Sequence, residues 1–175
     1  MKIAYRQFCP TDIHKFTRIN ADPLVESYGI GFYFQYYSRW REYFLVAENN
    51  YGEIVAYIMG KNEGIDENHH GHVTAVTVRS DYRKRGIARA LMERLEETSV
   101  DKGCYFVDLF VRKSNTAAIK LYQKLGYVVY REIIGYYTGP APENAYDMRK
   151  ALPLDTEKKS VIPLREPVDA STLPD

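Results

Sequence analysis

Cysteine is scarce in this sequence, and long apolar runs are missing. Only Cys9 and Cys104 occur among the 175 residues, too few for a disulfide framework or a cysteine-based metal site. No apolar run approaches the length of about 18 residues that a membrane helix needs. The N-terminus also lacks the apolar core of a signal peptide. We therefore expect a cytoplasmic protein that holds no metal and makes no direct contact with a membrane.

The chain also lacks a dominant charge. Its formal net charge is +1, which argues against nucleic-acid binding through a generally basic surface. Hydrophobic residues make up 45% of the chain and charged residues 27%, a composition typical of a folded globular protein. The length suits a single domain with a substantial core.

Alternating and helical patterns predict an α/β domain with a mixed sheet and helices on its faces. We expect a short strand and a helix start within residues 3–16, with Thr11 or Asp12 as the cap, and an aromatic helix over residues 28–44. Strands are expected at 43–49 and 53–61 (a hairpin), 72–78, 104–111 and 128–137, and a further element at 145–152. Helices are expected at 88–101 and from Ser114 or Asn115 to a stop at Gly126.

The last 25 residues differ in composition from the rest of the chain. Four of the eight prolines lie there: Pro153, Pro163, Pro167 and Pro174. We interpret residues 1–150 as the folded domain and residues 151–175 as a proline-rich tail. Two interpretations of the tail stay open, partial disorder and docking onto a partner.

Three cations stand immediately before the helix expected at 88–101. Arg83, Lys84 and Arg85 precede Gly86 in the stretch "RKRGIA", although a helix N-terminus carries partial positive charge and disfavours cations. A bound pyrophosphate would resolve the conflict, because the free amides of about residues 84–89 and the basic side chains would both contact it. The alternative is a solvated basic turn.

"RKRGIA" resembles the coenzyme A signature of the GNAT acetyltransferase superfamily through Arg83, Gly86 and Ala88. The later segment "NTAAIKLYQKLGY" is similar to that family's second motif, in the correct order along the chain. The resemblance implies a GNAT fold, with a central mixed, mostly antiparallel sheet flanked by helices, and acetyl-CoA as co-substrate. The implied coenzyme-binding residues are Val76, Thr77, Val78, Arg83, Lys84, Arg85, Gly86, Ile87, Ala88, Arg89 and Asn115. Asn115 alternatively serves only as a helix cap.

Further segments resemble the catalytic subunits of N-terminal acetyltransferase B (NatB) complexes, among them "DPLVESYGIGFYFQYY", "HGHVTAVTV" and "VDLFVRKSN". This implies acetylation of the α-amine of N-termini that begin Met-Asp, Met-Glu, Met-Asn or Met-Gln. It also implies a large helical-repeat auxiliary subunit, through which the enzyme reaches the ribosome and nascent chains; the aromatic helix is a candidate for part of that interface. Two alternatives stay open: a GNAT enzyme with another amine acceptor (other N-termini or lysine), and a non-catalytic CoA-binding module.

Two residues are candidates for catalysis. Alternation along residues 72–78 places His72 on one side of its strand with Thr74, Val76 and Val78, and an imidazole titrates in the range that a general base requires. His72 is alternatively a substrate contact or a structural histidine. The resemblance assigns Tyr122 to protonation of the leaving thiolate. It also places the peptide entrance at "VESYGIGF" (residues 25–32) and "GYYTG" (residues 135–139). The candidate substrate-binding residues are Glu26, Tyr28, Thr74, Tyr136 and Tyr137, each of which is alternatively a core residue.

Overall fold

The computed structural model describes residues 1–22 and 26–174, and the chain divides into two compact units. Unit 1 comprises Met1–Asn62 and Val73–Lys102, and unit 2 comprises Glu63–His72 and Gly103–Asp175. Strand β4 (His70–Val78) contributes residues to both units. In the described part of the chain, no helix combines the length and apolar character that crossing a membrane requires.

Unit 1 is built on strands that hydrogen-bond in the order β1-β2-β3-β4. Strand β1 (Ala4–Gln7) pairs antiparallel with β2 (Phe44–Glu48), which pairs antiparallel with β3 (Ile54–Glu63). The predicted hairpin between β2 and β3 is therefore confirmed. Its turn is closed by the Asn49 side-chain oxygen, which accepts hydrogen bonds from the Tyr51 and Glu53 amides at 3.0 Å each, as asparagine side chains commonly do in turns.

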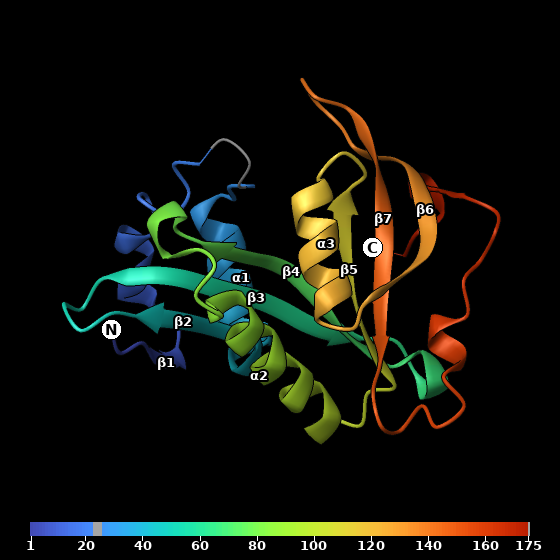
Figure 1. Ribbon diagram of the computed structural model, residues 1–175, viewed down its shortest axis with the longest axis horizontal. Coiled ribbons are helices and arrows are strands. Elements are labelled where there is room, and N and C mark those ends of the chain that lie inside the picture. Colours follow the sequence, from blue (N-terminus) through green and yellow to red (C-terminus); the bar gives the residue numbers. More distant parts are fainter. Residues whose placement is uncertain (23–25, 175) are drawn as a thin grey trace. The chain divides into compact units, whose positions relative to one another are not determined.

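Two helices cover opposite faces of the unit 1 strands (Figure 1). Helix α1 (Ile30–Arg39) buries Tyr33 and Tyr36 against a core that includes Phe44 and Tyr57. Helix α2 (Ile87–Asp101) buries one apolar stripe formed by Ile87, Leu91, Met92 and Leu95. These positions repeat with the helical period, which is why the amphipathic pattern of this segment predicted a helix.

The aromatic helix is shorter than its sequence pattern predicted. The expectation of a helix through residue 44 is wrong, because Trp40 leaves helical geometry (φ −136°) and a 3-10 turn, η2 (Arg41–Tyr43), follows. Phe44 begins β2, where its fully buried ring stacks on Phe8 with the ring centroids 4.0 Å apart. Tertiary packing of aromatic rings has thus overridden their four-residue spacing.

The segment after β1 also differs from its prediction. It forms a short 3-10 helix, η1 (Pro10–Lys15), whose N-cap is Cys9. Asp12 lies inside the first turn, where its carboxylate accepts the Cys9 amide at 2.8 Å and two hydrogen bonds from Arg6 at 2.8 and 2.9 Å. Arg6 also pairs with Glu48 at 2.7 Å. The buried Asp12 carboxylate therefore ties η1 to β1.

Unit 2 contains the strand order β4-β5-β7-β6-β8. Strands β5 (Phe106–Arg112) and β6 (Val128–Tyr137) each pair antiparallel with β7 (Glu143–Ala151), and helix α3 (Thr116–Lys124) connects β5 to β6. The short strand β8 (Val168–Asp169) pairs parallel with β6. The prediction of an α/β fold with a mixed, mostly antiparallel sheet is confirmed.

Residues 151–175 contribute η5 (Lys159–Val161), β8 and η6 (Ala170–Thr172) to unit 2. The segment runs beside β6 (Figure 1), and the Leu164 amide donates to the Tyr130 carbonyl at 2.8 Å. Asp155 anchors its first turn by accepting hydrogen bonds from Lys159 and Ser160. The division of the chain at residue 150, and docking of this segment onto a partner, stay predictions.

The geometry around Asp12 generates a stability prediction. Burial by itself would raise the pKa of Asp12, but hydrogen bonds from Arg6 and Cys9 outweigh it and hold that pKa below its ordinary value. The stabilisation is therefore complete above the unfolded-state pKa of about 3.9 and is lost as the pH falls through the lower folded-state pKa. Asp12→Asn should reduce the unfolding free energy by about 2 kcal/mol at pH 7, and by progressively less below pH 4.

Urea denaturation at pH 7 and at pH 3 measures this difference. Asp101→Asn is the matched control, because Asp101 is exposed at the end of α2 and should change stability by less than about 0.5 kcal/mol. An equal loss for both variants would contradict the role given to Asp12.

Candidate active site

The turn that leads into α2 has an unusual backbone. Two positions adopt left-handed geometry, Lys84 (φ +61°) and Gly86 (φ +77°), and Gly86 is the N-cap of the helix. A Cβ placed on Gly86 would meet no atom within 4 Å. Glycine is therefore favoured there by the backbone conformation and not by lack of space. The turn follows the short η4 (Ser80–Tyr82), which Arg79 alone separates from β4.

This turn presents backbone donors at the start of α2. Among the described residues no side chain caps the helix, and no acid stands in its first turn. The first N–H to bond back to the turn is that of Ala90, which donates to the Gly86 carbonyl at 3.1 Å. The preceding amides, those of Ile87, Ala88 and Arg89, have no intrahelical acceptor. They form, with the helix dipole, a site suited to an anionic group.

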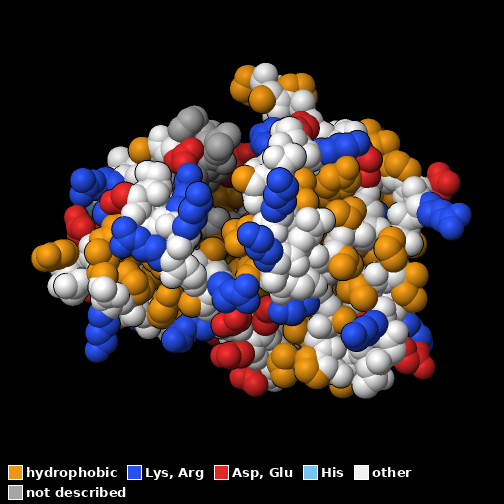
Figure 2. All heavy atoms as spheres, viewed as in Figure 1, with side chains coloured by type: hydrophobic (Ala, Val, Ile, Leu, Met, Phe, Trp, Pro, Cys, Tyr) orange, Lys and Arg blue, Asp and Glu red, His pale blue; other side chains and the backbone are white. Residues whose placement is uncertain are grey.

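The basic side chains of the turn are exposed, and those of Arg83 and Arg85 donate to backbone carbonyls that precede the turn. Arg83 donates to the Val78 carbonyl at 3.1 Å and pairs with Asp22 at 2.5 Å. Arg85 donates to the Asp81 carbonyl at 3.1 Å, and its guanidinium lies 4.9 Å from the centre of the Tyr82 ring. Lys and Arg side chains gather over the segment that leads into α2 (Figure 2). Arg89, in the first turn, pairs with Glu93 at 3.8 Å.

The unit 1 part of β4 carries several of the predicted site residues. Thr77 is buried, whereas Val76 and Val78 are half-buried. Thr74 donates its hydroxyl hydrogen to the Tyr36 oxygen at 2.8 Å, and the Tyr28 hydroxyl donates to the Thr74 carbonyl at 3.4 Å. The structure therefore brings the candidates Tyr28 and Thr74 together.

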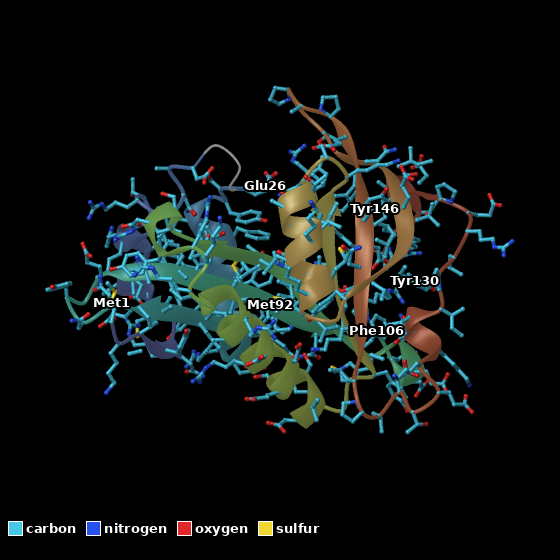
Figure 3. All side chains as sticks on the ribbon, viewed as in Figure 1. Met1, Glu26, Met92, Phe106, Tyr130 and Tyr146 are labelled. Atoms are coloured by element: carbon cyan, nitrogen blue, oxygen red, sulfur yellow. The ribbon has the colours of Figure 1, made fainter. Side chains whose placement is uncertain are left out.

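The stretch before α1 holds the remaining unit 1 candidate. Glu26 is exposed on this stretch (Figure 3). Val25, with which the predicted entrance segment begins, lies outside the described residues.

His72 lies in unit 2 and is paired with a buried carboxylate. Its Nδ1 is 2.6 Å from Oδ1 of Asp108, and both side chains are buried. Burial by itself would raise the pKa of Asp108, but the facing His72, His70 and Arg149 outweigh it and hold that pKa below its ordinary value. Asp108 is therefore an ionised acceptor. Asp108 was not among the site residues predicted from the sequence.

A sequence signal for Asp108 does exist. It is the only charged residue inside the apolar run "FVDLFV", and a carboxylate buried in a sheet needs a charged or donating partner. His72 precedes it on another predicted strand. A search for partners of buried acids would have proposed this pair.

The candidates Tyr136 and Tyr137 gather around Phe110 in unit 2. The Phe110 ring lies edge-on to His72 with the ring centres 5.0 Å apart, and its centre is also 5.0 Å from that of Tyr136. The Tyr137 hydroxyl donates to the Phe110 carbonyl at 3.5 Å, and the Arg112 guanidinium lies over the Tyr137 ring at 4.1 Å. The structure therefore brings His72, Tyr136 and Tyr137 into one aromatic cluster.

The last two candidates lie at opposite ends of α3. Asn115 is the N-cap, and its side-chain oxygen accepts the Ala118 amide at 3.2 Å. Tyr122 lies in the last turn, about 10 Å further along the helix axis, with its ring centre 6.2 Å from that of Tyr127. Burial raises the pKa of Tyr122 to about 12, so its phenol is protonated at neutral pH. In the part of the chain that the structure describes, no three His, Cys, Asp or Glu side chains form a metal-binding group.

Known proteins that are similar to this chain indicate its family. The model of the acetyltransferase (GNAT) family matches residues 13–127. The N-terminal acetyltransferase B complex catalytic subunit NAA20 of Arabidopsis thaliana is 52% identical over 170 residues, which cover 96% of each chain. The crystal structure of Chaetomium thermophilum Naa20 in complex with a bisubstrate analogue superposes with a TM-score of 0.88 at 39% identity, covering 96% of this chain and 97% of that one.

A NatB acetyltransferase complex bound to CoA and MES gives a TM-score of 0.79 at 38% identity, covering 86% of this chain and 99% of that one. The chain thus belongs to the GNAT acetyltransferase family and, within it, to the family of NatB catalytic subunits. The predictions of a GNAT fold and of an N-terminal acetyltransferase are confirmed.

The left-handed turn generates a second stability prediction. At Lys84 and at Gly86, the variant with glycine should be more stable than the variant with alanine by about 1 kcal/mol, because alanine is strained at positive φ. At Arg85, which is not among the residues with positive φ, the order should reverse, because glycine there only increases the entropy of the unfolded chain.

Thermal and urea denaturation of the six forms, without coenzyme, measures these differences: Lys84→Gly, Lys84→Ala, the native Gly86, Gly86→Ala, Arg85→Gly and Arg85→Ala. If alanine were preferred at Lys84 or Gly86, the left-handed geometry of the turn would be refuted.

Proposed function

We propose that this enzyme transfers the acetyl group of acetyl-CoA to the α-amine of protein N-termini that begin Met-Asp, Met-Glu, Met-Asn or Met-Gln. The observation that carries the proposal is the turn before α2, with its uncapped amides and fixed cations. The related proteins of known structure contain CoA or a bisubstrate analogue, ligands of the chemical class that such a turn suits.

The diphosphate of the coenzyme is proposed to lie on the turn. The amides of residues 84–89 donate to its oxygens, and Arg83, Lys84, Arg85 and Arg89 supply positive charge. The pantetheine arm pairs with the backbone of Val76, Thr77 and Val78. The Asn115 amide nitrogen contacts the coenzyme, while its oxygen keeps its hydrogen bond to the α3 backbone.

The acceptor amine needs only a modest base. An α-amine has a pKa near 8, so that about a tenth of it is neutral at pH 7. Its lone pair attacks the thioester carbonyl, the N–C bond forms, and the nitrogen then loses a proton as the C–S bond breaks. We assign the acceptor of this proton to Nε2 of His72, directly or through one water, because Nδ1 is engaged by Asp108.

Stabilisation of the leaving sulfur is assigned to Tyr122. A phenol with a pKa of about 12 is a weaker acid than a thiol, whose pKa is about 8.5. Complete transfer of its proton to a free thiolate is uphill by about 3.5 pKa units, or about 5 kcal/mol. The phenol is therefore best suited to donate a hydrogen bond to the negative charge that develops on sulfur during the reaction.

Recognition of the first two residues of the substrate is assigned to two groups of side chains. One group is Glu26, Tyr28 and Thr74, and the other is Tyr136 and Tyr137. Aromatic rings suit a methionine side chain. Hydroxyl donors such as that of Tyr137 suit an acidic or amide side chain at the second position.

We further propose that the enzyme works in the cytoplasm with a large helical-repeat auxiliary subunit that brings it to the ribosome and nascent chains. The related NatB structure is that of a complex. Helix α1 exposes 59% of Ile30 and 37% of Phe34, and these apolar side chains are candidates for part of the interface.

A peptide-panel assay tests the function. The full chain, alone and co-purified with its auxiliary subunit, is given acetyl-CoA and peptides that differ only in their first two residues. Met-Asp, Met-Glu, Met-Asn and Met-Gln peptides should have kcat/KM values at least tenfold above those of Met-Lys and Ser-Ser peptides and of an N-terminally blocked peptide with an internal lysine. Equal values for Met-Asp and Ser-Ser peptides would refute the specificity, and preference for the blocked peptide would identify lysine as the acceptor.

Tyr122→Phe tests the role of the phenol. The variant should lower kcat by about 10- to 100-fold, because it loses a hydrogen bond that strengthens in the transition state. The KM for acetyl-CoA should change by less than twofold. Steady-state kinetics on a Met-Asp peptide measure both. Tyr127→Phe is the matched control, because Tyr127 is the neighbouring ring and should leave kcat unchanged. A full-rate Tyr122→Phe variant would remove Tyr122 from the mechanism.

A further inference from the structure

Two histidines of β4 and one carboxylate of β5 form a buried cluster in unit 2. His70 and His72 are two residues apart on β4 and lie on one face, and both contact Asp108. The flanking β5 residues on that face are Phe106 and Phe110. Phe106 stacks flat on His70 with the ring centres 4.6 Å apart and the planes 6° apart, and Phe110 lies edge-on to His72. Each imidazole is therefore fixed by one ring and by one shared carboxylate.

We propose that Asp108 is a positioning residue that selects the tautomer of His72, and that His70 holds this carboxylate from its other side. The proposal rests on the proposed function, in which Nε2 of His72 accepts the proton of the substrate amine.

The tautomer follows from the hydrogen bond. An ionised carboxylate only accepts hydrogen bonds, so the 2.6 Å contact between Nδ1 of His72 and Oδ1 of Asp108 requires a proton on Nδ1. A neutral imidazole with its proton on Nδ1 has its lone pair on Nε2. Asp108 thus keeps available the nitrogen that the chemistry needs, and it removes the second tautomer, in which Nε2 already carries a proton.

His70 is held in the complementary orientation. Its Nδ1 donates to the Asn68 carbonyl at 2.6 Å, which directs Nε2 toward Oδ2 of Asp108 at 3.6 Å and Oε1 of Glu63 at 3.4 Å. Burial lowers the pKa of His70, but Glu63, Asp108 and Asn68 outweigh it, so the net shift is upward. A protonated His70 therefore places positive charge beside Asp108 and favours its ionised form.

The remaining charges around Asp108 compensate one another. Arg149 bonds to Asp147 at 3.2 Å, and Arg131 bonds to the same carboxylate at 2.9 Å. The Arg149 guanidinium also lies 4.5 Å from the ring centre of Phe106 and 3.6 Å from that of Tyr130; both residues are labelled in Figure 3. In the described part of the chain, Asp147 forms ion pairs with Arg131 and Arg149 and none with either histidine, but it is buried in the same cluster. It is therefore a matched control for the loss of a buried carboxylate.

The wild-type chain, in complex with its auxiliary subunit where that is needed for activity, is labelled with ¹⁵N-histidine. Long-range ¹H–¹⁵N spectra then report which ring nitrogen of His72 carries the proton. The expected result is protonation at Nδ1. In Asp108→Asn this signature should be lost, because the amide can donate to Nδ1 and release the other tautomer. Asp147→Asn should leave the His72 proton on Nδ1.

Kinetics on a Met-Asp peptide supply the second measurement. Asp108→Asn should lower kcat at least tenfold and change the KM for acetyl-CoA by less than twofold. In a His72→Gln background it should have no further effect, because Asp108 acts through His72. An equal loss of kcat in both backgrounds would show a merely structural role and overturn the inference.

The wild-type spectrum decides the question even if a variant does not fold. Protonation of His72 at Nε2 in an active wild-type enzyme overturns the inference while the proposed function stands. A wild-type enzyme that acetylates none of the peptides counts against the proposed function instead.

Discussion

The left-handed backbone at Lys84 and Gly86 is the constraint on which the proposed coenzyme site depends. It reverses the chain between β4 and α2 so that the first amides of the helix are left without side-chain caps. It also allows Arg83 and Arg85 to reach back to the carbonyls of Val78 and Asp81. In the proposed function, the cations that looked unfavourable at a helix N-terminus belong to a single anion-binding arrangement, in which backbone amides and basic side chains both donate to the anion.

The second half of the proposed chemistry depends on charges that are buried. Asp108 and Asp147 are both almost inaccessible to solvent, and their pKa values move in opposite directions. Burial and the nearby Asp108 raise the pKa of Asp147, and Arg149 and Arg131 only partly offset this, whereas His72, His70 and Arg149 lower the pKa of Asp108. One carboxylate thus carries the negative charge that the histidines require, and the other stabilises the arginines. Each exposed cation of the turn can be neutralised by solvent ions, but this cluster has to balance its charge internally.

Local sequence patterns predicted much of the fold. The alternation of residues 72–78 predicted a strand, and Asn115 and Gly126 marked the two ends of a helix, because capping and positive φ (Gly126, φ +98°) are properties of single residues. The aromatic spacing through Phe44 failed, since ring stacking between Phe44 and Phe8 is a contact over 36 positions that no local period reveals. Asp108 was missed for the same reason: its partner His72 is 36 residues away. The residues of "RKRGIA" alone left open whether this segment binds a pyrophosphate or is a solvated basic turn. Its resemblance to a family motif favoured the first interpretation.

The parallel pairing of β8 with β6 has a consequence for how the molecule behaves in solution. Strand β6 carries the exposed apolar side chains of Val128, Ile134 and Tyr136, and Ile133 and Ile134 take Val168 and Asp169 as their pairing partners. Without the last residues of the chain, this part of β6 would be an unprotected sheet edge flanked by apolar groups, a template for strand addition by another molecule. The C-terminal segment therefore covers this part of the sheet edge within the same molecule.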